Sequence, residues 1–270
     1  MKNSQKLSYK DATGVVQYNM TNDYMFRYIL QKNEKVLKGL ICSLLRLNPE
    51  KIQKIIITNP VDLNEDVEGK EFILDINVLL NDNQQINLEM QVENRHNWQD
   101  RSLSYLCRSF DQLYRGQDYE EALPVIHIGF LDYTLFSDTP EFYATNMVMN
   151  VKNHRIYNSK FVLSVVDLTQ IKLASEEDKK YQLDYWASLF KAKTWEEIKM
   201  LAEKNEFLEE AAQSVYVANA DEMVRQKCRA REEAERYERT LKRNIGKLQE
   251  ENLKLKEYIA ELEAQLENSK

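Results

Sequence analysis

The spacing of apolar residues predicts two helices near the start of the chain. TNDYMFRYIL begins with three residues of the types that favour helix N-termini, and apolar side chains follow at helical spacing. NEKVLKGLICSLLRLN repeats aliphatic residues on one face and stops before Pro49. We therefore expect two amphipathic helices between residues 21 and 48.

Three segments with strand patterns follow these helices. IQKIIITNP predicts a strand that ends at Asn59-Pro60, and the polar stretch 62–70 predicts a loop. EFILDINVLL and QQINLEMQVE predict two further strands, and the NDN sequence at 81–83 between them is a turn signal. We expect the last two strands to form a hairpin.

A helix and three strands are predicted over the next part of the chain. WQDRSLSYLCRSFDQLYRGQ has helical spacing and ends at Gly116. ALPVIHIGFLDY is apolar enough for a buried central strand, and FYATNMVMNV and KFVLSVVD predict strands at about 142–151 and 160–167. Helices, a strand, a hairpin, a crossover helix and more strands are typical of an α/β or mixed-sheet domain.

From Glu176 onward the pattern is purely helical. It predicts two or three short helices, and Thr194 with Glu197 three residues later matches a capping box. We expect three parts: an α/β domain over residues 1–170, a helical accessory region over 171–236 and a coiled coil over 237–270.

The predicted coiled coil is a heptad repeat. Two sets of residues recur every seven positions: Leu241, Leu248, Leu255 and Leu262, each followed four residues later by Ile245, Asn252, Ile259 and Leu266. The leucines take d positions and the second set takes a positions, where one asparagine favours a parallel two-stranded coil. We expect a homodimer through this coil; a helix folded back on its own domain is the alternative.

Composition restricts the class of protein. The 43% of hydrophobic and 30% of charged residues suit a folded protein with an exposed helix. We expect a cytoplasmic protein with no membrane partner, because no apolar run has the length of a signal-peptide core or a membrane span. Three widely spaced cysteines fit reduced thiols. The formal charge of −7 argues against a nucleic-acid partner, since phosphate binding usually needs basic surface.

Polar residues on the predicted hairpin are the candidate chemical site. Strand alternation places Asp75 and Asn77 on one face of the first strand, and Glu89, Gln91 and Glu93 on one face of the second. Because these faces adjoin in a hairpin, Asp75 and Glu89 could share a divalent ion. Oxygen ligands suit Mg²⁺ or Mn²⁺ rather than zinc.

Alternation alone leaves a second interpretation open. A solvent-exposed hairpin face carrying ordinary polar residues explains the same pattern. A zinc site is not indicated, since His96, His127 and His154 are isolated in the sequence.

Several blocks of the chain resemble the PD-(D/E)XK nuclease family transposases, also called Rpn-family recombination-promoting nucleases. The resemblance covers roughly residues 20 to 240, and the predicted coiled coil lies outside its core. The matching blocks are NDYMF at 22–26, NP at 59–60, Asp75 within ILDINV, NLEMQ at 87–91, Arg101 with Tyr105, LYRGQDY at 113–119 and LPVIHIGFLDYTLF at 123–136.

The resemblance implies roles for four residues. Asp75 is the first acidic ligand of a catalytic metal ion and Glu89 the second, and Asp23 is a further acidic residue at the site. Gln91 stands where the wider superfamily usually has lysine, which would supply a positive charge where glutamine supplies only dipoles. This departure suggests a weaker or more metal-reliant enzyme.

Arg101 and Tyr105 lie one helical turn apart on one face of the predicted helix. They are candidates to bind the phosphate of a substrate or to brace the site. An internal salt bridge is the alternative role for Arg101.

The resemblance implies a restriction-endonuclease-like mixed sheet flanked by helices and a Mg²⁺-dependent endodeoxyribonuclease linked to recombination or transposition. Mn²⁺ and Ca²⁺ are alternative ions, and DNA is the expected partner. The formal net charge of −7 is a weaker argument against DNA binding for a metal-dependent nuclease, because a bound cation inverts the sign of the electric field at the site. The alternative is a catalytically weak or inactive nuclease fold that acts as a dimeric DNA- or partner-binding module. Gln91 favours this alternative and the retained carboxylates oppose it.

Overall fold

The computed structural model describes residues 8–59, 75–113 and 115–267, so the loop predicted at 62–70 lies outside the described residues. The chain forms two compact units, Met1–Cys228 and Arg229–Lys270. The division at residues 170 and 236 that the sequence suggests stays a prediction.

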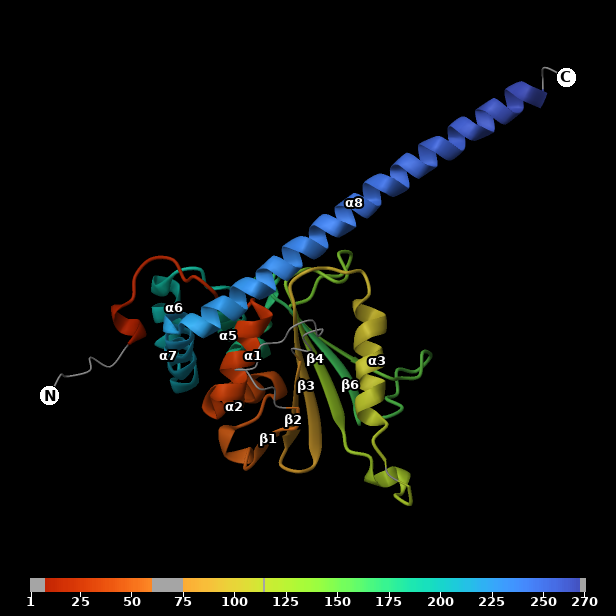
Figure 1. The fold of residues 1–270 in the computed structure, drawn as a ribbon. Helices are drawn as coiled ribbons and strands as arrows, with labels where there is room; N and C mark the ends of the chain where they lie inside the picture. Colours follow the sequence, from red (N-terminus) through yellow and green to blue (C-terminus); the bar gives the residue numbers. More distant parts are fainter. Residues whose placement is uncertain (1–7, 60–74, 114, 268–270) are drawn as a thin grey trace. The chain divides into compact units, whose positions relative to one another are not determined.

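A mixed sheet lies at the centre of the first unit (Figure 1), as the sequence predicts. β4 is central and pairs in parallel with β3 and β6, and the other neighbours pair antiparallel. The strands lie in the order β1-β2-β3-β4-β6-β5, with β1 at Ile55–Ile57, β2 at Ile76–Leu80, β3 at Gln84–Gln91, β4 at Val125–Leu131, β5 at Tyr143–Met147 and β6 at Phe161–Asp167.

The predicted hairpin is formed by β2 and β3. Asn81 and Asp82 both adopt the left-handed conformation, with φ of 50° and 57°, which is the geometry of the tight turn that suits a twisted antiparallel pair. The turn fixes the register, in which Ile76 faces Leu88. Continuing this register by one residue places Asp75 opposite Glu89.

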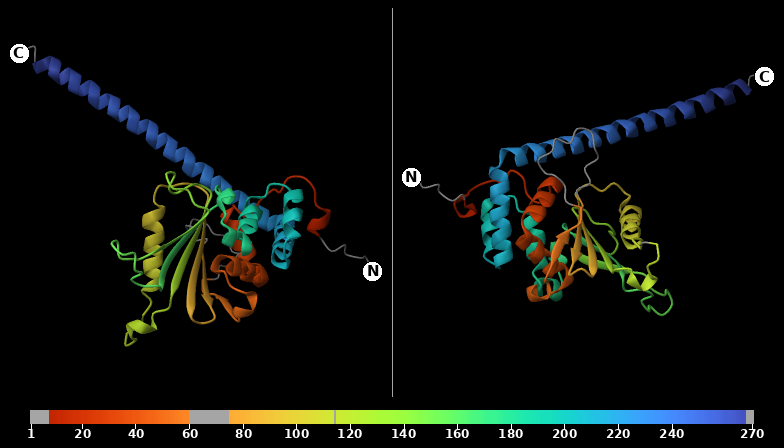
Figure 2. Two further views of the ribbon diagram at one scale, coloured as in Figure 1. Left: turned by 180° about the vertical axis from the view of Figure 1, so that it is seen from behind. Right: turned by 60° about the horizontal axis from the view of Figure 1, so that its bottom comes forward.

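Helices lie on both faces of the sheet (Figures 1 and 2). On one face, α1, α2, α5, α6 and α7 share a continuous apolar core with the sheet, and α3 lies on the other face. The helices are α1 (Asp23–Lys32), α2 (Glu34–Leu45), α3 (Trp98–Phe110), α4 (Glu176–Lys180), α5 (Leu183–Lys191), α6 (Trp195–Ala202) and α7 (Glu206–Ala220), with short 3-10 turns at Tyr9–Asp11, Pro49–Lys51, Tyr119–Glu121 and Ile171–Leu173.

The helix starts follow the capping signals of the sequence. The side chain of Asn22 accepts a hydrogen bond from the backbone of Met25, which opens α1. Thr194 and Glu197 form the reciprocal capping box of α6. These predictions are confirmed because caps are local interactions that tertiary packing does not need to override.

Several predicted elements are shorter than expected, among them the strand predicted at about 142–151, which is reduced to β5. The strand predicted over IQKIIITNP is reduced to β1, three residues long. The helix predicted to reach Gly116 ends at Phe110, because Asp111 leaves the helical conformation with ψ of 67°. Gly116 does have a positive φ of 96°, so it serves a later turn rather than the helix end.

The last helix, α8, runs from Glu222 to Glu267, and residues 229–267 of it make up the described part of the second unit. Within a single chain its predicted seam is between 40% and 58% exposed at Leu241, Ile245, Leu248, Leu255, Ile259 and Leu262. Over the described residues, no helix combines the length and the apolar character needed to cross a membrane.

Candidate active site on the α3 face of the sheet

β3 separates an apolar face from a polar one. Ile86, Leu88 and Met90 belong to the core shared with α1 and its neighbours. The alternate residues Asn87 and Glu89 point to the opposite face, which α3 covers, and both are buried. Buried polar side chains in a sheet are costly unless they have partners, so this face requires an explanation.

Asp75 lies just before β2 and is held through its backbone. The guanidinium of Arg27, a fully buried residue of α1, donates to the carbonyl oxygens of Asp75 and Asn59. Asn59 Nδ2 donates to the same Asp75 carbonyl at 3.1 Å, and Asn59 Oδ1 accepts from the backbone of Asn77 at 2.8 Å. α1 therefore fixes the start of β2 through the backbone of Asp75.

Asn87 connects the two strands of the hairpin on the polar face. Its Nδ2 donates to Oδ2 of Asp75 at 2.8 Å and also to Oδ1 of Asn77. Because both acceptors face Nδ2, the orientation of the amide is determined, and Oδ1 of Asn87 is a buried acceptor with no donor.

Glu89 is 5% exposed and is paired with α3. Nε and Nη2 of Arg101 both lie 2.8 Å from Oε1 of Glu89. Burial nevertheless raises the pKa of Glu89 to about 7, against the lowering effect of Arg101, and the nearby charge of Asp75 raises it further.

Tyr105 stands one helical turn beyond Arg101, as the sequence predicts. The guanidinium of Arg101 lies over its ring at 5.0 Å from the centroid, a cation–π contact. Burial raises the pKa of Tyr105, and Arg101 opposes that effect. The internal salt bridge that was the alternative role for Arg101 is present, and Tyr105 braces it.

His127 is distant in sequence from the other histidines and from the predicted hairpin, and the fold brings it to the polar face. It lies on β4 directly beside Asn87, and its Nε2 is 3.7 Å from Oε2 of Glu89. Burial lowers its pKa to about 3, so the imidazole is neutral and the contact is not an ion pair. Neither ring nitrogen has a hydrogen-bond partner among the described residues.

Trp98 closes the site above β4. Its ring packs over Gly129, the residue that pairs with Glu89, so closely that a Cβ at Gly129 would lie 2.1 Å from a ring carbon. The same ring lies 5.5 Å from the ring of His127. Glycine is therefore required at position 129 for the indole to pack this closely on β4.

The polar face carries unfilled hydrogen-bonding capacity. Oε2 of Glu89, Oε1 of Gln91 and Oδ1 of Asn87 are buried oxygen atoms without a donor. Such orphan oxygens are expensive in a closed interior but are what a hard divalent cation needs. The donor set of this face therefore fits Mg²⁺, Mn²⁺ or Ca²⁺.

The acidic groups are not gathered into a closed cage. Within 8–59, 75–113 and 115–267, no group of three or more His, Cys, Asp or Glu side chains is close enough to hold a metal ion. Oε1 of Glu89 is taken up by Arg101, and Oδ2 of Asp75 by Asn87. Oε2 of Glu89 has no donor, so this oxygen could bind an ion while Arg101 keeps its contact with Oε1.

Two further predicted residues are placed as follows. Gln91, at the end of β3 and 9% exposed, donates from Nε2 to the backbone oxygen of Glu93 at 3.1 Å. Asp23 is the first residue of α1 and 8% exposed, one turn before Arg27. Asp23 thus belongs to the helix that fixes Asp75, and its participation in the site stays a prediction.

Sequence reasoning missed Arg27, Asn87, His127 and Tyr133 at this face. Burial raises the pKa of Tyr133 to about 12, and Glu89 contributes to that rise, so this residue also lies near the carboxylate. Asn87 could have been found from the sequence, because it lies two residues before Glu89 on the same predicted strand and therefore faces the same side of the sheet. The others come from elements distant in sequence, and only the parallel pairing of β3 with β4 and the packing of α1 bring them together.

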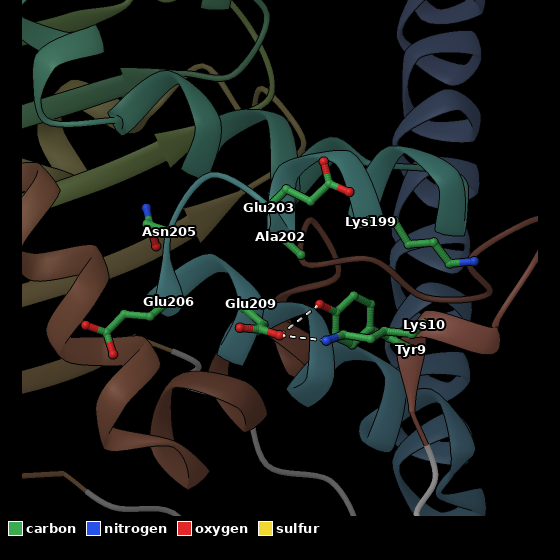
Figure 3. Close-up of a pocket in the computed structure, with 8 residues that line it drawn as sticks. All are labelled: Tyr9, Lys10, Lys199, Ala202, Glu203, Asn205, Glu206 and Glu209. Carbon is green, nitrogen blue, oxygen red and sulfur yellow. Dashed lines mark hydrogen bonds and ion pairs between the residues drawn. The ribbon is translucent and has the colours of Figure 1, made fainter.

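A pocket lies away from the polar face, between the Tyr9–Asp11 turn and the helices α6 and α7 (Figure 3). Its volume is about 620 Å³, and Lys10 bridges to Glu209 at 3.0 Å beside the ring of Tyr9. Its charged side chains are already paired or exposed to water, so size alone does not make it the functional site.

Comparison with known proteins identifies a family whose match includes the residues of this polar face. A family model described as PD-(D/E)XK nuclease family transposase matches residues 20–244. No curated protein and no solved structure matches the chain. The family match covers well over half of the chain and includes the hairpin, α3 and β4, which confirms the resemblance noted in the sequence motifs. The chain belongs to the PD-(D/E)XK nuclease family transposases.

Proposed function

We propose that the polar face of β2 and β3 is the active site of a metal-dependent endodeoxyribonuclease that hydrolyses phosphodiester bonds. The observation that carries this proposal is the register of β2 and β3, which brings Asp75 opposite Glu89, together with orphan oxygens on Glu89 and Gln91. A link to recombination or transposition, and a cytoplasmic location, rest on the family and the composition.

Asp75 and Glu89 would hold the ion, with Mg²⁺ as the first choice and Mn²⁺ or Ca²⁺ as alternatives. A bound ion supplies acidity to a water molecule and offsets negative charge that builds on the phosphate. The pKa of the buried Glu89 would fall once a cation is bound, because the positive ion repels a proton from the carboxylate.

Arg101 would change partners during the reaction. Its fork is held by Oε1 of Glu89 in the free protein and matches phosphate oxygens equally well. Arg101 would turn to the phosphate when the ion takes Glu89, and Tyr105 would keep contact with its guanidinium. Asp23 is proposed as a further acidic group, acting from α1.

Gln91 sets the expected strength of catalysis. Its amide can orient a water molecule but supplies no positive charge. Gln91→Lys is therefore expected to change the cleavage rate while Asp75→Ala abolishes cleavage. An unchanged rate in Gln91→Lys would contradict this role.

The C-terminal helix would make the protein a homodimer. The seam described above is exposed in the single chain, and Asn252 at an a position favours a parallel pair. Sedimentation of the full chain and of Leu248→Asp tests this: the dimer should dissociate in the variant. A wild-type monomer would contradict it.

Cleavage of supercoiled plasmid by the purified full chain tests the activity. Reactions would contain Mg²⁺, Mn²⁺, Ca²⁺ or EDTA, beside Asp75→Ala and Glu89→Ala. Nicking or linearisation that needs metal and is lost in both variants is the expected result. Glu141→Ala, at an exposed position, is the control. Metal-independent cleavage, or cleavage that survives both substitutions, would contradict the assignment.

A catalytically weak or inactive binding module is the second candidate. Two observations favour it: Gln91 in place of a lysine, and the ion pair by which Arg101 occupies Glu89. A folded chain that binds DNA equally well with metal, with EDTA and in Asp75→Ala, and that cuts in none of these conditions, would support this candidate.

A further inference from the structure

A hairpin extends the sheet beyond its edge strand. Residues 148–157 form this β5–β6 hairpin, which follows β5 and leads back toward β6 (Figure 1, green). Met149 pairs with Ile156, and the backbone N–H of Asn150 donates to the carbonyl oxygen of Arg155 at 2.9 Å. Every residue of the hairpin is exposed. Backbone hydrogen bonds therefore hold in place an arm whose side chains are open to water.

The hairpin lies in the longest part of the chain that has no acidic residue. Asp and Glu are absent from 142 to 166, although the whole chain has 44 acidic residues and a formal charge of −7. Lys160 is committed to two backbone carbonyl oxygens at 2.8 Å. Lys152 and Arg155 are exposed, and neither has an ion-pair partner among the described residues. The hairpin is thus a local positive surface on an acidic protein.

The turn of the hairpin uses up acceptor atoms and leaves donors. Oδ1 of Asn150 accepts from the backbone N–H groups of Lys152 at 2.9 Å and Asn153 at 3.2 Å. Oδ1 of Asn153 accepts from the backbone of Arg155 at 3.0 Å. Because these oxygens close the turn, the Nδ2 groups of both asparagines are left as donors. Cations and amide donors without a carboxylate among them match the phosphate oxygens of a nucleic acid.

The register of the sheet relates the hairpin to the face that carries the candidate active site. Asn87 of β3 pairs with His127 of β4. His127 pairs with Leu163 of β6, and Leu163 pairs with Asn146 of β5. Since the side chains of directly paired residues lie on one face of a sheet, Asn146 at the base of the hairpin is on the same face as Asn87.

Strand alternation continues this face into the hairpin. Val148, two residues after Asn146, lines a groove of about 260 Å³ together with Trp98, which closes the candidate active site. Tyr157 stands opposite Val148, because its backbone N–H donates to the Val148 carbonyl at 2.9 Å. Arg155 lies two residues before Tyr157 and therefore shares its face. A cation and an aromatic ring that is 80% exposed thus lie on the side of the candidate active site.

We propose that the β5–β6 hairpin binds the backbone of double-stranded DNA beside the step to be cut. The inference rests on the proposed nuclease function, for which it names the surface that holds the substrate. Lys152 and Arg155 pair with phosphates, the asparagine Nδ2 groups donate to phosphate or sugar oxygens, and the ring of Tyr157 packs against a deoxyribose. An anionic membrane also presents phosphates, but the face that the hairpin shares with the candidate active site favours DNA.

Binding of a labelled duplex of about 30 base pairs tests the inference with the full chain in EDTA, over a range of salt concentrations. The double variant Lys152→Gln, Arg155→Gln should bind about tenfold to a hundredfold more weakly than the wild type at about 0.1 M salt. The slope of log K against log salt should fall by about 1.8, since each phosphate contact contributes about 0.9 to it.

The double variant Lys32→Gln, Lys51→Gln is the matched control. It removes two exposed positive charges of the same unit outside the hairpin, so its affinity and slope should stay close to those of the wild type. Tyr157→Ala should weaken binding severalfold and leave the slope unchanged, because an uncharged ring releases no counterions.

Three results would overturn the proposal: no binding of the duplex by the wild type, no loss of affinity in the Lys152→Gln, Arg155→Gln variant, or an equal loss in the control variant. Vesicles of phosphatidylserine and phosphatidylcholine test the other source of phosphate. Vesicle binding that needs Lys152 and Arg155, without an effect of these residues on the duplex, would also overturn it and assign the hairpin to a membrane surface.

These outcomes can be distinguished from failure of the proposed nuclease. A duplex affinity that depends on the hairpin, in a protein that cuts no plasmid in any metal, would support the binding surface and contradict the activity. Metal-dependent cleavage that Asp75→Ala abolishes, with an unchanged duplex affinity in the hairpin variant, would support the activity and overturn the binding surface.

Discussion

The two faces of β3 and β4 differ in how completely their side chains are satisfied. On the α1 face, Leu88 and Phe130 are fully buried in a continuous apolar core. On the α3 face, Glu89 and His127 are equally hidden, yet each retains polar atoms without partners. Adjacent residues of one strand thus follow opposite rules. The apolar face stabilises the fold, whereas the polar face keeps buried polar atoms without hydrogen-bond partners, which a ligand can bind.

The largest expected effect is on the apolar face. Leu88→Ala should lower the free energy of unfolding by about 2 to 5 kcal/mol, because it deletes a fully buried side chain and leaves a cavity. Urea denaturation measures this loss. Its neighbour Glu89→Gln, tested in EDTA, should cost nothing or stabilise the protein. Equal losses at both positions would remove the distinction between the faces.

A smaller loss is expected on the α3 face, where the indole of Trp98 packs on Gly129. Gly129→Ala should destabilise the protein by about 1 to 3 kcal/mol, since its new methyl group collides with the ring of Trp98 and forces it away from β4. The intrinsic fluorescence of Trp98 should also shift toward that of a solvated indole. Gly246→Ala, in open space on α8, is the control. An unchanged stability would show that the indole does not depend on Gly129.

The last expected effect is a pH dependence carried by Glu89. Its pKa is raised from an ordinary value of 4.5 to about 7, so the fold prefers the protonated form. This contribution to stability is fully present below pH 4.5 and is lost as pH rises through about 7. In EDTA, Glu89→Gln should gain stability relative to the wild type between pH 4.5 and 7.5, about the limits of that window. Glu141→Gln is the exposed control, and a parallel profile for all three proteins would contradict the raised pKa.

The hairpin could be predicted because its signals are local. Alternation and the NDN turn place Asp75 opposite Glu89 without knowledge of the rest of the fold. Capping residues predicted the starts of α1 and α6 for the same reason. The end of α3 was not predictable from Gly116, since a glycine with positive φ serves any turn and not only a helix end.

The surroundings of the carboxylates could not be predicted. His127 reaches Glu89 through a parallel pairing between strands separated by α3, and periodicity within each strand does not determine such a pairing. Arg27 is a charged residue within the predicted first helix, and it is fully buried and donates to the Asp75 carbonyl. Both contacts are long-range, so they depend on the assembled sheet.

Thermal unfolding with and without metal tests most directly whether the polar face is a cation site. The wild type, melted in EDTA and then in saturating Mg²⁺ or Mn²⁺, should gain several degrees in Tm, because an ion that binds only the folded state stabilises it. Glu89→Gln should start from an equal or higher Tm in EDTA and gain almost nothing from metal. A wild type without a metal-dependent shift, or a variant with the same shift, would contradict the account.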